Sequence, residues 1–290
     1  QKDKVFTLYV SKKTGDVAGT EFGVCSRRQS CGYTNYPVTE SDFWRNDLNT
    51  YLKRPKRIKP PKQKKYLDKG KYKDKLYRSF DNNRFCDFVQ IQIGVKNADK
   101  AISKYLLGTG DHSSVIYPYF DKNFNLVTYK TMHYELMTGK RDKTKQPKYD
   151  WNPDRYDIPF FGSQLIDKHP ELPIGIVEGE KTAVLMSFYA PQILWLGAGS
   201  ATMLTVNKIE PIKHRTIYLY PDAGCFDGNI SWFNKMEEIK KAYPRIDIDI
   251  SKECELWCES GDISEGDDIA DYYCKQYKFN HQKQLILKVM

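Results

Sequence analysis

The sequence contains no apolar stretch near the roughly 20 residues that a membrane-spanning helix needs, so we expect no membrane partner. It also lacks the basic start, apolar run and small-residue cleavage site of a signal peptide, so we expect a cytoplasmic protein. Its seven cysteines are an odd number scattered along the chain, which argues against a disulfide framework. No internal repeat is visible, so a repeat architecture is not expected.

The chain has enough apolar and aromatic residues to fold. Its 290 residues are 40% hydrophobic and 14% aromatic, which supports two modest domains or one large one and argues against wholesale disorder. The net charge of +9 comes from one segment, because residues 53–75 hold 12 Lys/Arg and 2 Asp, a surplus of +10. This segment predicts a solvated linker that attracts phosphate backbones, whereas the rest of the chain is close to neutral.

A small hairpin is predicted within residues 1–40. A first strand precedes a turn at Gly15, and a second strand ends at Cys25. Cys25 and Cys31 then resemble the distal half of a zinc ribbon. Tetrahedral zinc requires four ligands, usually as two pairs, so we expect Zn²⁺ here only if a further cysteine pair lies upstream of Gln1. The alternative is two unrelated thiols.

Residues 41–79 are predicted to form a helix and the basic linker. The next unit, residues 80–168, has an α+β pattern. Its predicted elements are two helices, two alternating strands and a turn: 82–93, 98–105, 113–121, 125–135 and 138–141. The strands form an antiparallel meander that places Lys130, Lys140 and Arg141 on or near one sheet.

Strands and helices alternate strictly within residues 169–290. The predicted strands cover 173–180, 193–200, 216–222 and 245–251, and the first is a continuous apolar strand that ends in acids. The predicted helices between and after them cover 181–190, 203–210, 230–243 and 267–277. Buried strands joined by helices indicate a parallel sheet covered on both faces. The expected fold class is therefore α/β in this part and α+β for the whole chain.

Acidic side chains gather where these strands end. In an open α/β sheet, ligands bind at the carboxyl ends of the strands. Three segments present acids there: Val-Glu-Gly-Glu at 177–180, Pro-Asp-Ala-Gly at 221–224 and Gly-Asp-Asp-Ile-Ala-Asp at 266–271. Clustered carboxylates repel one another unless a cation neutralises them, and oxygen ligands suit Mg²⁺ or Mn²⁺. Such an ion can bind phosphates and stabilise displacement at phosphorus.

The order of these segments resembles the Toprim domain of primases and topoisomerases, over about residues 172–280. The first Toprim motif is a hydrophobic strand followed by Glu-Gly, which this chain has at Val177-Glu178-Gly179. The resemblance implies that Glu178 is a general acid/base or a metal-associated residue. Glu180-Lys181-Thr182 is similar to the Glu-Lys-Thr-Ala variant of phage and plasmid primase-like proteins.

The second motif departs from the family. Toprim domains carry Asp-x-Asp, whereas this chain reads Asp222-Ala223-Gly224, so Asp227 or Asp268 would have to compensate. The departure leaves open whether two metal ions bind and whether catalysis survives. The resemblance implies catalytic roles for Glu178, Asp222 and Asp268. It implies that the same three acids and Asp227 bind Mg²⁺ or Mn²⁺.

Upstream segments extend the resemblance to nearly the whole chain. A Cys-Gly-Tyr knuckle, a basic linker, Leu-Gly-Thr at 107–109 and Pro-Phe-Phe-Gly at 159–162 precede the Toprim segment, as in a primase-like family of bacterial mobile elements. This implies a Mg²⁺-dependent nucleotidyltransferase that makes short RNA primers on single-stranded DNA for mobile-element replication. It implies nucleoside triphosphates as substrates and a replicative helicase as a partner. The residues assigned to nucleic-acid or nucleotide binding are Lys130, Lys140, Arg141 and Lys181.

Other interpretations of the same residues stay open. The missing second acid fits a catalytically inactive Toprim protein that binds nucleic acid, and the same acids would also serve a Toprim nuclease. Asp222 could instead cap the helix that follows it. Asp267 and Asp268 could cap their own helix, where acids suit the helix dipole. Lys181, at the start of a helix, could be an ordinary surface residue.

Overall fold

The computed structural model describes residues 6–9, 23–25, 34–35, 66–79, 81–150 and 158–277. The chain divides into two compact units, Gln1–Lys64 and Lys65–Met290. In the first unit, β1 (Phe6–Leu8), β2 (Gly23–Cys25) and β3 (Thr34–Asn35) form an antiparallel sheet in that order. Cys25 ends β2, but Cys31, the predicted helix at the start of 41–79 and most of the basic segment lie outside the described residues. The zinc half-site therefore stays a prediction.

Three helices open the second unit, and side-chain caps explain where two of them begin. α3 (Lys69–Lys73) follows Asp68, whose side chain accepts the Gly70 N–H. α4 (Arg84–Ile93) follows Asn83, whose side chain accepts the Cys86 N–H. Gly94, with a φ of 79°, ends α4 and allows α5 (Val95–Tyr105) to start at once. The predicted pair of helices corresponds to α4 and α5.

The antiparallel meander forms as predicted. β4 (Gly108–Thr109), β5 (Val115–Phe120), β6 (Leu126–Met132) and β7 (Lys148–Tyr149) pair in this order, each antiparallel to the next. Every residue of β5 is buried, and most of β6 is buried as well. Other parts of the unit therefore cover both faces of this hairpin, including the positions that alternation alone would assign to solvent.

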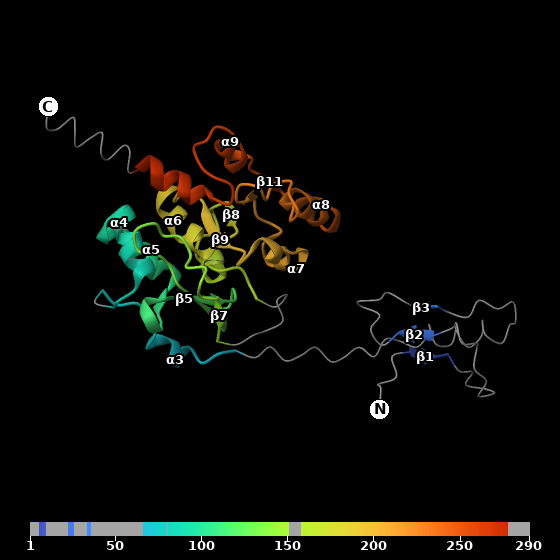
Figure 1. Ribbon diagram of the computed structural model, residues 1–290, viewed down its shortest axis with the longest axis horizontal. Helices are drawn as coiled ribbons and strands as arrows, with labels where there is room; N and C mark the ends of the chain where they lie inside the picture. The colour runs from blue at the N-terminus through green and yellow to red at the C-terminus, as the bar shows by residue number, and fades with distance from the viewer. Residues whose placement is uncertain are drawn as a thin grey trace, which may run out of the picture. The chain divides into compact units, whose positions relative to one another are not determined.

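The α/β part follows. Its sheet has the order β11-β10-β8-β9 and only parallel pairings, with strands β8 (Ile174–Val177), β9 (Leu194–Gly197), β10 (Ile217–Tyr220) and β11 (Ile248–Ile250). Its helices are α6 (Glu180–Tyr189), α7 (Val206–Ile209), α8 (Trp232–Ala242), α9 (Glu253–Glu259) and residues 269–277. The predicted fold class is confirmed, with a helix-flanked parallel sheet and an antiparallel sheet upstream (Figure 1). None of the described helices is long and apolar enough to cross a membrane.

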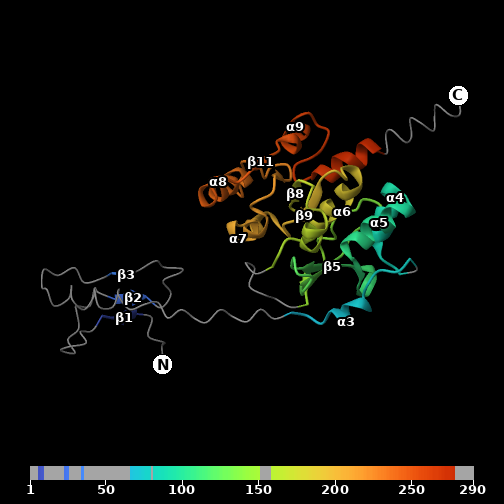
Figure 2. The ribbon, with the colours of Figure 1, turned by 180° about the vertical axis from the view of Figure 1, so that it is seen from behind.

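One hydrophobic core joins the two sheets. Tyr105 of α5 stacks on Phe161 with ring centroids 5.0 Å apart, and its hydroxyl donates to the Trp195 carbonyl of β9 at 2.8 Å. Phe161 also forms an isolated bridge with Gly197. α5 lies beside α6 in both views (Figures 1 and 2). Within the second unit, α5, the last helix before the antiparallel sheet, therefore packs directly against α6, the helix that follows β8.

Candidate functional site

Glu178 and Asp222 lie at the carboxyl ends of neighbouring parallel strands. Val177 at the end of β8 is opposite Tyr220 at the end of β10. Glu178 follows Val177 directly, and Asp222 follows Tyr220 by two residues. The two carboxyl groups lie close enough for each to influence the pKa of the other. Oδ1 of Asp222 is buried and has no hydrogen-bond partner. The structure thus brings these two predicted residues together and leaves one buried carboxylate oxygen available.

Asp268 approaches the same loop from the turn that precedes the last helix. The Ala223 N–H donates to the Asp267 carbonyl and the Gly266 N–H donates to the Ala223 carbonyl, both at 3.0 Å. These two bonds hold the turn against the loop after β10. Oδ1 of Asp268 accepts the Asp271 N–H at 3.0 Å, and Oδ2 of Asp271 accepts the Asp268 N–H at 3.1 Å. This reciprocal pair caps the last helix, so the helix-cap interpretation of Asp268 is confirmed.

Asp268 already has a cation beside it. Nζ of Lys181 lies 3.0 Å from Oδ2 of Asp268 and 2.7 Å from Oδ1 of Asp271. The Thr182 hydroxyl donates to Oδ2 of Asp268 at 2.7 Å. Burial alone would lower the pKa of Lys181, but the two carboxylates outweigh burial and raise it. Lys181, with its side chain 13% exposed, is therefore a largely buried ion-pair partner rather than an ordinary surface residue.

Burial raises the pKa of each of the three acids, and repulsion from neighbouring acids adds to the effect. Burial, then Asp268 and then Glu178 raise the pKa of Asp222 well above its usual range. Burial and Asp268 raise the pKa of Glu178, although a backbone hydrogen bond from Ala201 opposes them. The pKa of Asp268 is also raised, because burial outweighs the pairing with Lys181. A bound divalent cation would stabilise the ionised form of such carboxyl groups, because it relieves their repulsion.

Glu180 and Lys130 form a buried ion pair between α6 and β6. Nζ of Lys130 lies 2.8 and 3.1 Å from the two carboxylate oxygens of Glu180, and the side chains are 7% and 2% exposed. The Tyr119 hydroxyl also donates to Glu180. Lys130 donates in addition to the Gly199 carbonyl at 3.1 Å. Lys130, predicted to bind nucleic acid or nucleotide, thus lies inside the unit and ties the antiparallel sheet to the residues around Glu178.

The loop after β9 completes the surroundings of Glu178. The Gly199 N–H donates to the Glu178 carbonyl at 2.9 Å, and the Ala201 N–H donates to its carboxylate. Nζ of Lys208 on α7 donates to the Ala198 carbonyl at 2.9 Å. Burial lowers the pKa of Lys208 to about 7. Two buried lysines, Lys130 and Lys208, therefore hold this loop by its carbonyl groups.

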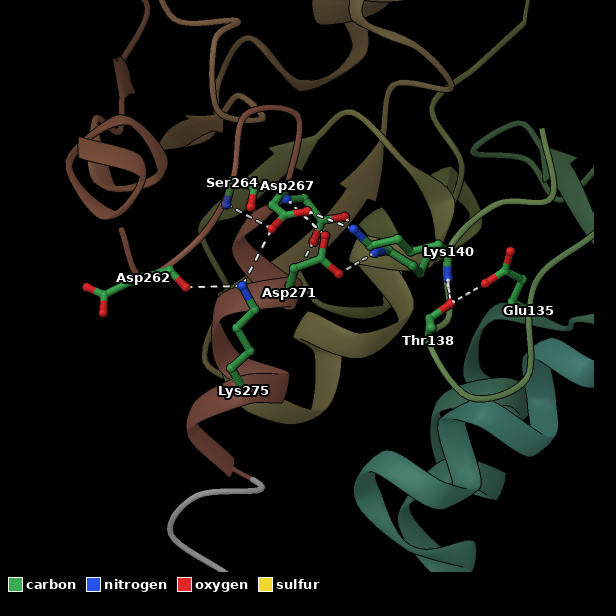
Figure 3. A network of polar contacts seen from close by, with 10 residues as sticks. Glu135, Thr138, Lys140, Asp262, Ser264, Asp267, Asp271 and Lys275 are labelled. Atoms are coloured by element: carbon green, nitrogen blue, oxygen red, sulfur yellow. Dashed lines mark hydrogen bonds and ion pairs between the residues drawn. The ribbon is translucent and has the colours of Figure 1, made fainter. Parts of the chain in front are cut away.

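Three further predicted residues are exposed. Asp227 lies in the loop between β10 and α8, and Arg141 follows the turn after β6. Lys140 has a side chain 67% exposed, and its Nζ lies 3.7 Å from Oδ1 of Asp267 (Figure 3). Lys275 approaches the other oxygen of Asp267 at 3.6 Å. Asp267 is thus flanked by two exposed ammonium groups at the rim of the acidic residues.

Sequence reasoning missed several contributors, because their partners come from distant parts of the chain. Glu255 on α9 accepts two backbone N–H groups of the loop that carries Asp222, at 2.9 and 3.1 Å. The Cys225 thiol lies 3.9 Å from Glu178. Burial and then the charges of Glu178 and Asp222 raise the pKa of that thiol to about 12. Neither Glu255 nor Cys225 belongs to a motif of the sequence, whereas Thr182 lies inside the Glu-Lys-Thr segment.

Within the described residues, no group of three or more His, Cys, Asp or Glu side chains is arranged to hold a metal ion. Glu178 and Asp222 nevertheless have suitable chemistry, since they are adjoining oxygen donors with one buried oxygen unpartnered. Mg²⁺ usually keeps several waters and binds through one or two carboxylates together with substrate phosphates. The pair therefore fits a divalent cation that arrives with phosphate, whereas Asp268 is occupied by Lys181.

Comparison with known proteins gives one family and several solved structures. A family described as a domain of unknown function (DUF6371) matches residues 83–223, a little under half of the chain. The chain is similar to the primase fragment of the bacteriophage T7 primase-helicase protein, at 14% identity and a TM-score of 0.40, over 64% of this chain and 70% of that one. It is similar to a DnaG primase catalytic domain bound to single-stranded DNA, at 15% identity and a TM-score of 0.40, over 65% and 58% of the two chains. It is also similar to the zinc-binding and RNA polymerase domains of Aquifex aeolicus primase, at 16% identity and a TM-score of 0.36, over 69% of this chain and 47% of that one. No curated protein sequence matches the chain.

Proposed function

We propose that this protein is a Toprim-type, primase-like nucleotidyltransferase that uses Mg²⁺ or Mn²⁺ to join ribonucleotides into short primers on single-stranded DNA during mobile-element replication. The observation that carries the proposal is the meeting of Glu178 and Asp222 at the ends of β8 and β10, where a buried Asp222 oxygen has no partner. This is the edge of an α/β sheet at which ligands bind. Nucleoside triphosphates and the DNA strand are the proposed substrates, and a replicative helicase is a proposed partner.

The residues of the site have distinct proposed roles. Glu178 and Asp222 would hold the divalent cation, which when bound would neutralise phosphate charge as displacement proceeds. Lys181 and Asp268 fix the start of α6 against the turn that precedes the last helix, because they pair at 3.0 Å with little exposure. Lys140 is free to turn toward a phosphate, since its contact with an acid is long and exposed.

A nucleic-acid-binding module without catalysis is the second candidate. The observation that favours it is the pairing of Asp268 with Lys181, which removes one acid from the set that could bind a metal ion. The chain also has Gly224 where the resemblance calls for a second acid. Such a module would keep the fold and the exposed lysines but would not synthesise primers.

Primer synthesis by the full chain tests the proposal, with single-stranded DNA, labelled nucleoside triphosphates and Mg²⁺ or Mn²⁺. We expect short labelled products that disappear in Asp222→Asn and in Glu178→Gln. Glu237→Gln, an acid on α8 with a side chain 44% exposed, is the matched control and should keep full activity. Normal synthesis by Asp222→Asn would sink the proposal. DNA binding without any product would support the non-catalytic module, and strand cleavage that requires Asp222 would support a nuclease.

A further inference from the structure

Phe124 lies at the tip of the β5–β6 hairpin in a conformation that few aromatic residues adopt. Its φ is +63°, in the left-handed region that favours Gly and Asn, and the residue is 38% exposed. Its ring stacks on Phe120, with centroids 4.7 Å and planes 3° apart. The turn would form with less strain around a Gly, yet the chain displays an aromatic ring there. A local rule broken at the surface in this way is a feature typical of functional positions.

Two lysines from other elements stand over this ring. Nζ of Lys69 on α3 is 5.3 Å from the ring centroid of Phe124 and donates to its carbonyl at 3.0 Å. Nζ of Lys168, at the end of the 3-10 helix Ser163–Lys168, is 5.5 Å from the same centroid. Both distances suit cation–π contacts. Both lysines are exposed, so their ammonium groups can also reach a phosphate.

A second exposed ring adjoins the same turn. Tyr66 is 45% exposed, and its hydroxyl hydrogen-bonds to Asp121, the residue after β5. The Leu67 N–H donates to the Leu126 carbonyl at 2.7 Å, which holds this segment along the start of β6. Tyr66 directly follows residues 53–65, a stretch of 8 Lys/Arg with no acid. The aromatic residues are therefore continuous in sequence with the most basic part of the chain.

We propose that Tyr66, Lys69, Phe124 and Lys168 form a docking site for single-stranded nucleic acid, which we call the hairpin-tip surface. When a strand binds, the two ammonium groups leave the Phe124 ring for the flanking phosphates, and unpaired bases stack on the freed face of Phe124 and on the Tyr66 ring. The rings favour a single strand, because a duplex covers the faces of its bases and an anionic membrane or acidic peptide has none. The inference goes beyond the proposed function, since this surface lies on elements other than those that carry the acids and binds a strand whether or not the acids catalyse.

Equilibrium binding of the full chain to a fluorescent oligothymidylate, in EDTA, tests this surface. Phe124→Asn removes the ring while Asn tolerates the left-handed conformation, so the turn is retained. We expect about tenfold weaker binding from the loss of one base stack, with an unchanged dependence on salt. Lys69→Gln combined with Lys168→Gln should instead reduce the slope of log affinity against log salt by about 1.4, since each single-strand phosphate contact contributes about 0.7.

Phe233→Asn on α8 is the matched control, because Phe233 is 39% exposed and belongs to another surface. It should bind as the wild type does. Equal affinity of Phe124→Asn and Phe233→Asn would overturn the proposal. Equal weakening of single-stranded and duplex binding would overturn it too, as would binding to anionic lipid vesicles that depends on Phe124 when DNA binding does not. Because binding is measured without a divalent cation, a failure of primer synthesis and a failure of this surface are distinguishable.

Discussion

Replacing Glu180 with Gln should destabilise the second unit strongly, because it leaves the Lys130 ammonium buried without its counter-charge. The two side chains are 7% and 2% exposed and lie 2.8 Å apart. Burial alone would lower the pKa of Lys130, but Glu180 outweighs burial and raises it, so the lysine depends on this carboxylate to stay charged. Removing one partner of a buried ion pair costs about 3–5 kcal/mol of the free energy of unfolding.

The size of the effect can be stated as a melting temperature. For a domain of this size each kcal/mol shifts the Tm by about 2–4 °C, so Glu180→Gln should lower it by roughly 6–20 °C. Combining Glu180→Gln with Lys130→Met removes both charges and should recover much of the loss. The coupling between the two positions then follows from a double-mutant cycle.

Urea unfolding followed by tryptophan fluorescence is a suitable assay, since Trp195 and Trp232 are fully buried. The control is Glu210→Gln, because Glu210 pairs with Lys213 at the same 2.8 Å but with side chains 54% and 45% exposed. Water screens an exposed pair, so this variant should change stability little. If Glu180→Gln loses no more stability than Glu210→Gln, then burial does not set how much an ion pair contributes to the free energy of unfolding, and the reasoning is refuted.

Three further predictions concern titration and cation binding. Burial and neighbouring acids raise the pKa values of Asp222 and Glu178, so without a divalent cation the folded state loses stability as the pH rises through those raised values. Asp222→Asn should therefore have a higher Tm than the wild type at pH 8 in EDTA. A lower Tm would contradict this. Mg²⁺ or Mn²⁺ at 100 times its Kd should stabilise the wild type by about 2.7 kcal/mol and Asp222→Asn much less, as thermal shift titrations can measure; equal shifts would place the cation elsewhere. Burial lowers the pKa of Lys208 to about 7, so above that pH the unfolded chain binds one more proton than the folded chain. The stability of the wild type relative to Lys208→Met should therefore rise from pH 7 toward pH 10. A stability difference independent of pH would show that burial does not lower the pKa of Lys208.

The parallel sheet and the acids at its edge were predictable because their signals are local. Most of the strands are short apolar runs, and Glu178 and Asp222 follow two of these runs within two residues. α9 was not predicted, because seven residues with acids in the first turn carry little apolar periodicity. Its Trp257 instead stacks at 3.8 Å on Tyr272, from the last helix, a contact that no window of sequence displays.

The lysines show the same limit. Alternation on β6 placed Lys130 on a sheet but did not say which face would be covered, and in the fold both faces are. Lys181 had the same local appearance as a surface residue at a helix start. Its two acids come from the other end of the α/β part.

The sequence by itself determined the kinds of element, their order and which carboxylates reach the carboxyl edge of the sheet, because apolar periodicity and strand ends are written within a few residues. Only the tertiary structure decided which of those carboxylates are paired and which keep an unpartnered oxygen. Lys130 is 50 residues from Glu180, and Thr182 is 86 residues from Asp268. A charge removed from water needs a counter-charge or hydrogen bonds, and the groups that supply them are brought together only when the distant segments pack.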